Sequence, residues 1–253
     1  MILSDTPKIQ AFNIDCMEFM KDKPDNYYDL AIVDPPYGIG VARDTRFGIK
    51  TKKAGSERTS HALKAWDDAI PSPEYFAELC RVSKHQVVWG ANHYNLAGGR
   101  LFWHKNQTTY TASSGEIAYL SMVNGVHYVN ILWHGAYQED MLNKEKRIHP
   151  TQKPVALYRW LLSNYASCKD CKNEGSYYED VAGDGGSQML IHCDSCCRSE
   201  RNFRILDTHG GSFSSAIACH MEGFDLDICE LDGDYFNDAV KRFKLNTIQE
   251  KLF

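Results

Sequence analysis

The stretch at residues 28–33 constrains the fold of this chain more than any other feature. It is a largely apolar run bounded by a turn, and it is followed at once by Asp34 and two prolines. A continuous run of this length is typical of a strand buried on both faces of a parallel sheet, where polar and apolar residues need not alternate. The run therefore predicts a central strand that delivers Asp34 at its carboxyl end.

The rest of the chain alternates between further strands and helices. We expect strands at residues 9–14, 86–89, 100–103, 117–122, 203–206 and 224–229, and helices at 16–21, 73–81, 154–164, 214–222 and 234–243. This alternation predicts an open, mostly parallel α/β sheet with helices on both faces. The chain has 253 residues, 43% of them hydrophobic, which suits a single domain over residues 1–253.

The turn after the central strand combines an acid, two prolines and an aromatic ring. Asp34, Pro35, Pro36 and Tyr37 lie at the sheet edge where ligands bind in α/β folds. The two prolines fix the backbone and remove two N–H donors, so their carbonyl groups remain as acceptors in a constrained direction. Asp34 and the Pro35 carbonyl could accept the hydrogens of an aromatic amine and make its nitrogen more nucleophilic. Tyr37 could stack on an extruded base.

A second strand end has the features of a nucleotide site. The expected strand at 203–206 is followed by Asp207, Thr208, His209, Gly210, Gly211 and Ser212, and then by a helix. Glycines let a ligand approach the backbone closely, and the start of a helix offers free N–H groups. Glu230 ends the next strand, where its carboxylate can accept hydrogen bonds from ribose hydroxyls. These residues predict an adenosyl site.

Two Cys-x-x-Cys pairs mark an insert at residues 167–201. The four thiols are Cys168, Cys171, Cys193 and Cys196. Their spacing is typical of zinc ribbons, although the pairs alone would also allow redox chemistry, and Cys197 and His192 are spare ligands. We expect a hairpin tip at residues 183–186 and a structural zinc, because four cysteines leave no open position on the metal.

Charge is distributed unevenly along the chain. The formal net charge is −5, yet residues 41–64 hold seven Lys or Arg against two acidic residues. Such a segment could hold the phosphates of DNA, although a solvated loop would have the same composition. No stretch has the length and apolarity of a membrane span or a secretion signal, so we expect a cytoplasmic protein with no membrane association.

Two motifs resemble those of one enzyme family. Residues 34–37 resemble the D-P-P-Y motif of amino-group DNA methyltransferases. Residues 149–154 resemble the H-P-T-Q-K-P motif that lies beside the methionine end of the cofactor in that family. The second resemblance implies that His149, Gln152 and Lys153 bind the cofactor.

The turn at residues 207–212 resembles the D-P-F-x-G-S-G-T cofactor motif of the same family. It departs from that motif at Thr208 and His209, and Phe213 stands where a second glycine is usual, so its bulk could narrow the pocket. The three motifs follow one another in the order of the circularly permuted β class. The resemblance covers most of the chain apart from the basic segment and the cysteine insert, and it implies a Rossmann-like fold that binds S-adenosylmethionine.

Other positions match the family as well. Asp15 and Cys16, with Asn13, match the position that contacts the adenine of the cofactor. Further matches lie at Trp66, Asp67, residues 89–94 and Glu116. The cofactor-binding set implied by the motifs and strand ends is Asp15, Cys16, His149, Gln152, Lys153, Asp207, Thr208, His209, Gly211, Ser212 and Glu230. Within the family, Asp at the first motif position favours adenine in DNA, whereas Asn is found in enzymes that methylate protein glutamine and Ser favours cytosine.

These observations predict an enzyme that transfers a methyl group from S-adenosylmethionine to the N6 amine of a flipped-out adenine in DNA, as in restriction–modification systems of prokaryotes or phages. Within enzymes, the alternative is methylation of cytosine N4. A second alternative is a catalytically inactive, zinc-containing DNA-binding relative that has lost the cofactor because of Phe213. The role of the cysteine insert is open between DNA contact, a homodimer interface and its own stability.

Overall fold

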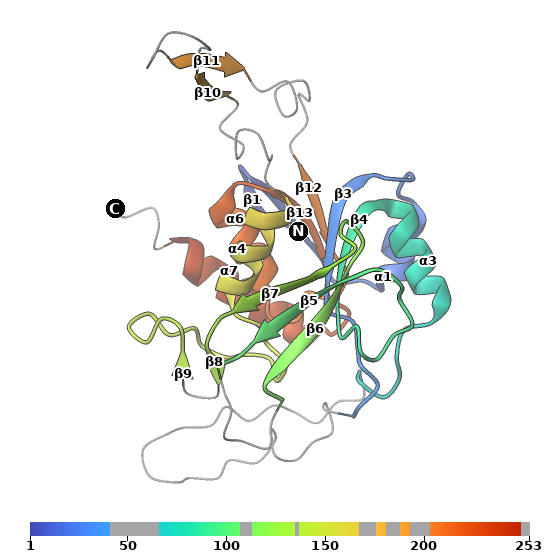
Figure 1. Cartoon of the computed structure of the whole chain (residues 1–253). Helices are drawn as coiled ribbons and strands as arrows, with labels where there is room; N and C mark the ends of the chain where they lie inside the picture. Colours follow the sequence, from blue (N-terminus) through green and yellow to red (C-terminus); the bar gives the residue numbers. More distant parts are fainter. Residues whose placement is uncertain are drawn as a thin grey trace.

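The computed structural model describes residues 1–40, 66–106, 113–134, 137–166, 176–180, 188–192 and 203–248. Nine strands form the main sheet, in the order β1-β2-β13-β12-β3-β4-β6-β5-β7 (Figure 1). They are β1 (Ile2–Asp5), β2 (Lys8–Phe12), β3 (Tyr28–Val33), β4 (Ser83–Trp89), β5 (Gly99–His104), β6 (Gly115–Leu120), β7 (Val126–Asn130), β12 (Arg204–Asp207) and β13 (Asp225–Cys229). The helices are α1 (Cys16–Lys21), α3 (Pro73–Val82), α4 (Val155–Tyr165), α6 (Ser214–Glu222) and α7 (Gly233–Ile248).

The sheet is parallel through its centre and mixed toward its edges. β2, β13, β12, β3 and β4 pair in parallel, whereas β1 is antiparallel to β2, and β6 is antiparallel to both β4 and β5. β7 returns to pair in parallel with β5. The expected α/β sheet is therefore confirmed, with its parallel strands gathered where the predicted functional residues lie.

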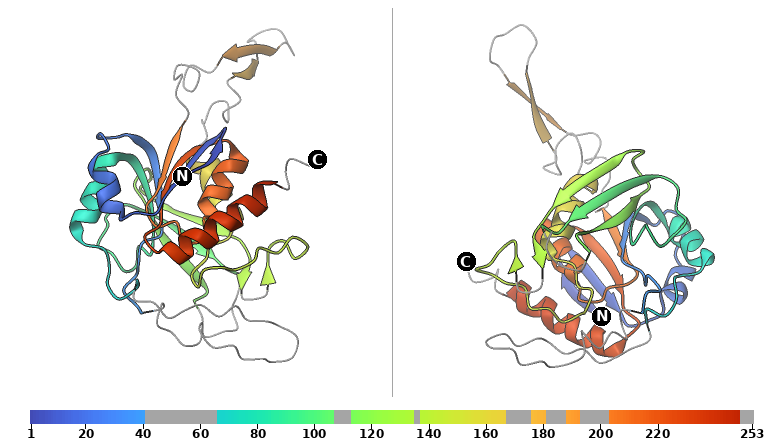
Figure 2. Two further views of the ribbon diagram at one scale, coloured as in Figure 1. Left: turned by 180° about the vertical axis from the view of Figure 1, so that it is seen from behind. Right: turned by 60° about the horizontal axis from the view of Figure 1, so that its bottom comes forward.

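Helices cover the two faces of the sheet. α4, α6 and α7 lie on one face, while α1 and α3 lie on the other, as the views in Figures 1 and 2 show. The central strand β3 is buried along its whole length, as expected from its continuous apolar run. Leu30 and Ile32 belong to the core on the α4 and α6 side, whereas Ala31 and Val33 belong to the core on the α1 and α3 side.

Asp29 is a charged residue inside this buried strand. Its carboxylate accepts a hydrogen bond from Lys84 Nζ at 2.8 Å and another from the backbone N–H of Arg204 at 3.0 Å. A buried carboxylate is tolerated when it is paired and hydrogen-bonded in this way. The acid therefore does not interrupt the strand that the apolar run predicted.

Several elements differ from the expectation. The helix expected at 154–164 is α4, which begins after Pro154, and the last helix runs five residues past the predicted end at 243, to Ile248. The strand expected at 9–14 ends at Phe12. β1 and β7 were not predicted, because as strands near the sheet edges they are largely exposed and lack an apolar run. Short strands β8 (Trp133–His134) and β9 (Tyr137–Gln138) form a separate hairpin.

Within the cysteine insert, β10 (Ser176–Asp180) and β11 (Gln188–His192) pair as an antiparallel hairpin that stands away from the main sheet (Figures 1 and 2). The expected tip at 183–186 and the thiols of Cys168, Cys171, Cys193 and Cys196 lie outside the described residues. The zinc site therefore stays a prediction. No group of three or more candidate metal ligands occurs within the described part of the chain.

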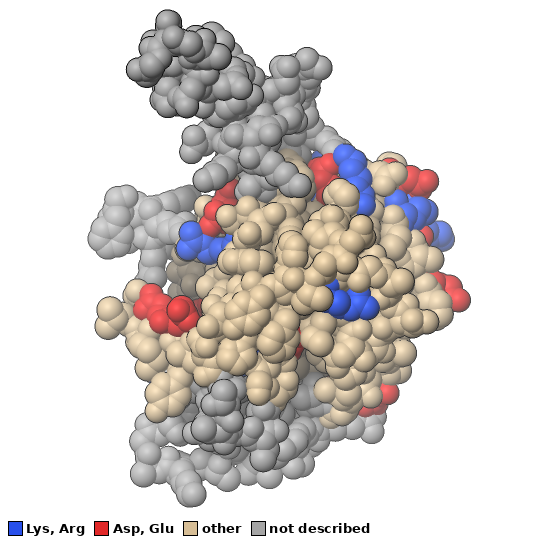
Figure 3. Space-filling model, viewed as in Figure 1, with Lys and Arg blue, Asp and Glu red and all other residues tan. Residues whose placement is uncertain are grey.

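The basic segment at 41–64 also lies outside the described residues. Figure 3 shows one face of the molecule, on which the described Lys and Arg side chains are scattered and form no broad patch. Among the described helices, none has both the length and the apolarity needed to cross a bilayer.

Candidate functional site

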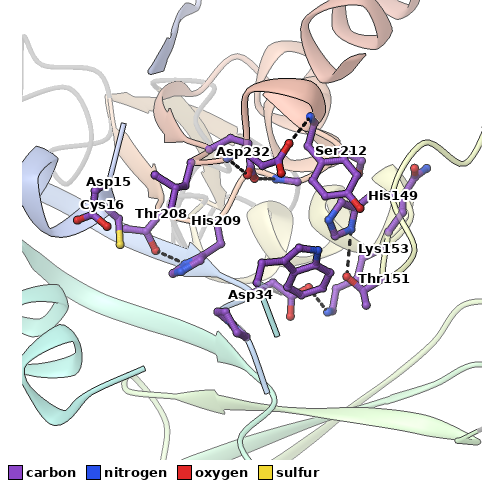
Figure 4. Close-up of a pocket in the computed structure, with 18 of the residues that line it drawn as sticks. Asp15, Cys16, Asp34, His149, Thr151, Lys153, Thr208, His209, Ser212 and Asp232 are labelled. Atoms are coloured by element: carbon purple, nitrogen blue, oxygen red, sulfur yellow. Dashed lines mark hydrogen bonds and ion pairs between the residues drawn. The ribbon is translucent and has the colours of Figure 1, made fainter. Parts of the chain in front are cut away.

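The carboxyl ends of four parallel strands meet at one edge of the sheet. β3 leads into Asp34, β12 ends at Asp207, β13 leads into Glu230, and β2 leads to Asp15. A cavity of about 450 Å³ opens at this edge (Figure 4). Its volume is within the range of about 300–1,000 Å³ that is usual for sites of small molecules and cofactors.

Most of the predicted residues line this one cavity. Those that do are Asp15, Cys16, Asp34, Pro36, His149, Gln152, Lys153, Thr208, His209, Gly211, Ser212 and Glu230. Pro35, Tyr37 and Asp207 are not among the residues that line it. The structure thus brings Asp34 and the 207–212 turn, which are far apart in the sequence, into a shared space.

Asp207 holds the 207–212 turn through its carboxylate. Its side chain is buried, and its two carboxylate oxygens accept hydrogen bonds from the N–H of His209 at 3.0 Å and from Ser215 Oγ at 2.5 Å. Burial raises the pKa of Asp207 to about 7. These contacts fix where the turn leaves β12, so Asp207 shapes the cavity without facing it.

Glu230 joins the two loops that form one wall of the cavity. Its Oε2 accepts a hydrogen bond from the N–H of Gly211 at 2.7 Å, and its Oε1 accepts one from the N–H of Asp232 at 2.8 Å. Two backbone donors therefore fix the plane of this carboxylate. Each oxygen of Glu230 is therefore held by a backbone N–H group, and both donors belong to the turns beside the cavity.

The bulk of Phe213 does not narrow the pocket. Its side chain is fully buried, packs edge-on against Phe236 with ring centroids 5.8 Å apart, and is not part of the cavity wall. Phe213 has a φ of 59°, in the left-handed region that glycine adopts at no steric cost, which explains why glycine is usual there. A Cβ added at Gly210 would lie 2.7 Å from the Phe213 ring, so the phenylalanine requires the glycine before it.

His209 stands where the family motif has Phe. Burial lowers the pKa of the imidazole to about 4, so the ring is neutral at physiological pH. Its Nδ1 lies 2.9 Å from Thr208 Oγ1, which in turn lies 2.7 Å from the Tyr75 hydroxyl. Tyr75 is a buried residue of α3, so this chain of hydrogen bonds links the His209 ring to the helix layer formed by α1 and α3.

Asp15 and Cys16 form the wall beside α1. Asp15 is the N-cap of that helix and accepts hydrogen bonds from the N–H groups of Met17 at 2.8 Å and Glu18 at 3.2 Å. Burial, and then the neighbouring Asp15 carboxylate, raise the pKa of the Cys16 thiol to about 12. Cys16 therefore presents a neutral thiol to the cavity.

Aromatic rings and an acid complete the cavity, and of these residues only Asp232 and Tyr235 were missed from the sequence. The His149 ring lies between Trp66, at 5.2 Å, and Tyr235, at 4.3 Å between ring centroids. Trp66, Asp232 and Tyr235 all line the cavity. Asp232 lies two residues after Glu230 and just before α7, and Tyr235 lies in the first turn of α7, so their place after a strand-ending acid was the signal available in the sequence.

Arg242, which was also missed from the sequence, links the 207–212 turn to Glu145. It is 6% exposed, and its guanidinium donates hydrogen bonds to the Ser212 carbonyl at 2.6 Å and to Glu145 Oε2 at 2.5 Å. Glu145 also accepts a hydrogen bond from the N–H of Val155 at the start of α4. Gln152 braces the same region, since its Oε1 accepts a hydrogen bond from the N–H of Ile148 at 3.0 Å.

At the strand end occupied by Asp34, side chains fill the space. Asp34 Oδ1 accepts a hydrogen bond from the Tyr37 hydroxyl at 2.6 Å, and Oδ2 lies 2.5 Å from Lys153 Nζ. The Tyr37 ring stacks on His93, with centroids 5.0 Å apart and planes at 15°. Tyr37 therefore already has a stacking partner, at the face where we expected an extruded base.

The side chain of Tyr94 and a glycine at position 90 hold the turn that follows Asp34. The Tyr94 hydroxyl lies 2.9 Å from the Pro35 carbonyl and 2.6 Å from the Pro36 carbonyl, to which it donates. Gly90 has a φ of 78°, and a Cβ there would lie 2.3 Å from the Tyr37 ring. The ring thus requires a glycine at the end of β4.

Comparison with known proteins identifies the fold. No protein-family model matches the chain, and no curated protein matches it in sequence. The solved structure of PvuII DNA methyltransferase (cytosine-N4-specific) is similar over 96% of this chain and 91% of that chain, with a TM-score of 0.51 and 10% identity. The M1.HpyAVI–SAM complex is similar over 92% of this chain and 99% of that chain, with a TM-score of 0.48 and 19% identity. The likeness to the PvuII enzyme shows that this chain shares the α/β fold of that DNA methyltransferase.

Proposed function

We propose that this chain is a DNA methyltransferase that transfers a methyl group from S-adenosylmethionine to the N6 amine of an adenine rotated out of the duplex. The observation that carries the proposal is the single cavity shared by Asp34, the 207–212 turn and Glu230. It brings an acceptor for an aromatic amine next to a wall suited to a nucleoside. Asp at position 34 favours adenine over the other amine substrates of the family.

The cavity suits S-adenosylmethionine by the chemistry of its donors and acceptors. Glu230 and Asp232 offer carboxylate acceptors for ribose hydroxyls, and Asp15 offers one for an adenine amine. Trp66 and Tyr235 offer aromatic surface. When bound, the cofactor supplies a methyl group activated by a positively charged sulfur.

The residues of the chain then act on the amine. An aromatic amine is a weak nucleophile because its lone pair is delocalised into the ring. A hydrogen bond from the amine to Asp34 would favour a pyramidal nitrogen with its lone pair directed into the cavity. Tyr37 would hold the base by stacking once His93 has moved from its face.

Methylation of cytosine N4 is the second candidate. The observation in its favour is the likeness to a methyltransferase that is specific for cytosine N4. Both bases present an exocyclic amine, and both would meet Asp34 through that group. Adenine is larger by one ring, so the two candidates differ in how much space must open near Tyr37.

Two measurements test the proposal. Calorimetric titration with S-adenosylhomocysteine should show one binding site per chain, whereas an inactive relative that has lost the cofactor would show none. Incubation with unmethylated genomic DNA and S-adenosylmethionine, followed by digestion to nucleosides and mass spectrometry, should then yield N6-methyl-2′-deoxyadenosine. Detection of N4-methyl-2′-deoxycytidine in its place would favour the second candidate over the first. Detection of no modified nucleoside would contradict both.

The segments outside the described residues extend this proposal. We expect the basic segment at 41–64 to contact DNA phosphates, so replacing its Lys and Arg by Ala should weaken DNA binding and make the binding less dependent on salt concentration.

We expect Cys168, Cys171, Cys193 and Cys196 to bind one zinc ion. Elemental analysis of the purified chain would show about one zinc per chain, and a chain free of zinc would contradict this expectation.

A further inference from the structure

Lys153 is a buried cation that the proposed function does not yet use. Its side chain is 2% exposed. Its Nζ lies 2.5 Å from Asp34 Oδ2, 3.0 Å from Glu116 Oε2 and 3.1 Å from the Tyr37 hydroxyl. The family resemblance implied a role for Lys153 at the methionine end of the cofactor, but its ammonium group is directed at the catalytic carboxylate (Figure 4).

The charges around Lys153 form a balanced cluster. Glu116 also pairs with Lys105, so two lysines face two carboxylates. Burial would raise the pKa of Glu116, but Lys153 and Lys105 together hold it at about 2. Burial likewise opposes the charge on Lys153, and Asp34 and Glu116 together raise its pKa. The lysines thus favour the charged form of Glu116, and the two carboxylates favour the charged form of Lys153, whereas burial raises the pKa of Asp34 above its ordinary value despite its pairing with Lys153.

Four elements supply this cluster, and one of its members is fixed at both ends. Asp34 follows β3, Glu116 lies in β6, Lys105 follows β5, and Lys153 precedes α4. The carbonyl of Lys153 accepts a hydrogen bond from Ser214 Oγ at 2.7 Å, at the start of α6. Lys153 therefore spans from the cofactor turn to the strand end that bears the catalytic acid.

The two oxygens of Asp34 differ in how firmly they are held. Oδ2 faces the buried ammonium group, whereas Oδ1 accepts only the neutral Tyr37 hydroxyl, at 2.6 Å. A hydrogen bond between neutral and charged groups is weaker than a buried ion pair, so Oδ1 is the easier oxygen to free. Tyr37 must in any case leave its present stacking partner if it is to stack on a base.

We infer that Lys153 is a positioning residue that holds Asp34 through Oδ2, with Glu116 as its second anchor, and leaves Oδ1 for a hydrogen of the substrate amine. The inference rests on the proposed function, since it assigns the amine to one oxygen of the proposed catalytic acid. It also gives Tyr37 two positions, on Oδ1 in the free protein and on the base during methylation. Lys153 then acts through Asp34 and not through the cofactor.

Removal of the cation tests this assignment. In Lys153→Met we expect kcat for methylation to fall by about 100-fold or more, because the carboxylate loses its orientation and its charge partner. The affinity for S-adenosylhomocysteine should stay within about threefold of wild type. Lys153→Arg, which keeps the charge, should recover part of the lost rate. A large loss of S-adenosylhomocysteine affinity with kcat retained at saturation would overturn the inference and restore the cofactor role.

A second readout does not depend on activity. The charged and titratable groups near Asp34 are Lys153, Lys105, Glu116, Tyr37, Tyr94, Tyr158 and Asp207. In Lys153→Met the carboxyl carbon-13 resonance of Asp34, assigned with Asp34→Asn, should titrate about 1–3 pH units higher than in wild type. Lys153→Arg should titrate near wild type. Unchanged titration in the Met variant would contradict the pairing.

The two readouts separate failure of the inference from failure of the proposed function. If wild type methylates no DNA but the titration moves as expected, the ion pair is real and the proposed reaction is wrong. If wild type methylates DNA and Lys153→Met is as active, the positioning role is wrong. Circular dichroism and thermal unfolding show whether each variant folds. If Lys153→Met does not fold, wild type is compared with Lys153→Arg in both readouts. Complete loss of methylation, or of the wild-type titration of Asp34, in a folded Lys153→Arg variant would contradict the inference.

Discussion

The wall at Glu230, where we propose that the cofactor binds, and the strand end at Asp34, where we propose that catalysis occurs, face the same cavity but are built differently. At the cofactor wall, Glu230 is held by two backbone N–H groups, and the space in front of it is open. At the catalytic end, Asp34 is held by the side chains of Tyr37 and Lys153, and Tyr37 stacks on His93. If the proposed function is right, the comparison indicates that the proposed cofactor site is formed in advance, whereas the proposed base site forms only when side chains move.

This difference follows from which groups make the contacts. Backbone donors at a turn cannot leave without unfolding the turn, so the acceptors they fix stay in place. Side chains can change rotamer without unfolding the backbone, so a site that they fill can open when a ligand replaces their contacts. We therefore expect the protein to bind cofactor before, and independently of, DNA.

The first prediction concerns the packing under the cofactor turn. Phe213→Ala should lower the free energy of unfolding by about 3–5 kcal/mol, because it removes a fully buried ring that supports Gly210. Urea denaturation measures the effect. Phe213→Gly relieves the positive φ but leaves the same cavity, so it should be close to the Ala variant; a stability equal to wild type in both would show that the turn does not depend on this packing.

The second prediction concerns the carboxylate that the backbone fixes. Glu230→Gln should weaken S-adenosylhomocysteine binding by about 10–100-fold, since it replaces charge-assisted hydrogen bonds by neutral ones. Calorimetry measures the affinity, with the peripheral Glu222→Gln as the matched control. If both Glu230→Gln and Glu222→Gln bind S-adenosylhomocysteine as tightly as wild type does, Glu230 only stabilises the two loops. The comparison between the two ends of the cavity would then lose its basis.

The third prediction concerns His209. Its pKa is lowered to about 4 in the folded protein, below the value of about 6.5 for an exposed histidine, so the folded state disfavours its protonation. Stability should therefore be complete above about pH 6.5 and fall as the pH drops toward 4, by about 2 kcal/mol at pH 5. His209→Phe should remove this contribution, so denaturation of both proteins at pH 7.5 and pH 5 gives the difference directly. The same pH dependence in both would contradict a buried neutral imidazole.

The smallest effect is expected at Tyr94. Tyr94→Phe removes the hydroxyl that lies against the Pro35 and Pro36 carbonyls and should cost about 1 kcal/mol of stability. It should leave S-adenosylhomocysteine affinity unchanged, because Tyr94 is outside the cofactor cavity. The KM for DNA should stay equal or fall, since the Pro35 carbonyl becomes free for the amine. A strong rise in that KM would indicate that the hydroxyl orients the turn.

Much of the fold could be predicted from local sequence. The buried strand at 28–33, the glycine turn after β12 and the helix after residue 154 all have patterns that act over a few residues. Strand order in parallel sheets then gathers their carboxyl ends at one edge. The edge strand β7 lacked such a pattern, because four of its five residues are exposed and its place depends on pairing with β5.

The contacts that complete the site could not be predicted in this way. Lys153 meets Asp34 across 119 residues, and Arg242 meets Glu145 across 97. Whether a lysine near a cofactor motif faces the cofactor or a buried acid depends on the packing of α4 against the sheet. Likewise Phe213 looked like an obstruction in the sequence, and only its burial against Phe236 shows that it is part of the core.

The most direct test of the central claim is methyl transfer by wild type and by Asp34→Ala, measured on preparations whose S-adenosylhomocysteine affinity has been determined first. With a methyl-labelled cofactor and unmethylated DNA, wild type should label adenine. Asp34→Ala should bind S-adenosylhomocysteine equally well and label DNA about 10²–10⁴-fold more slowly or not at all. Equal labelling by the two proteins would contradict the assignment of the amine to this carboxylate, and with it the account of the site.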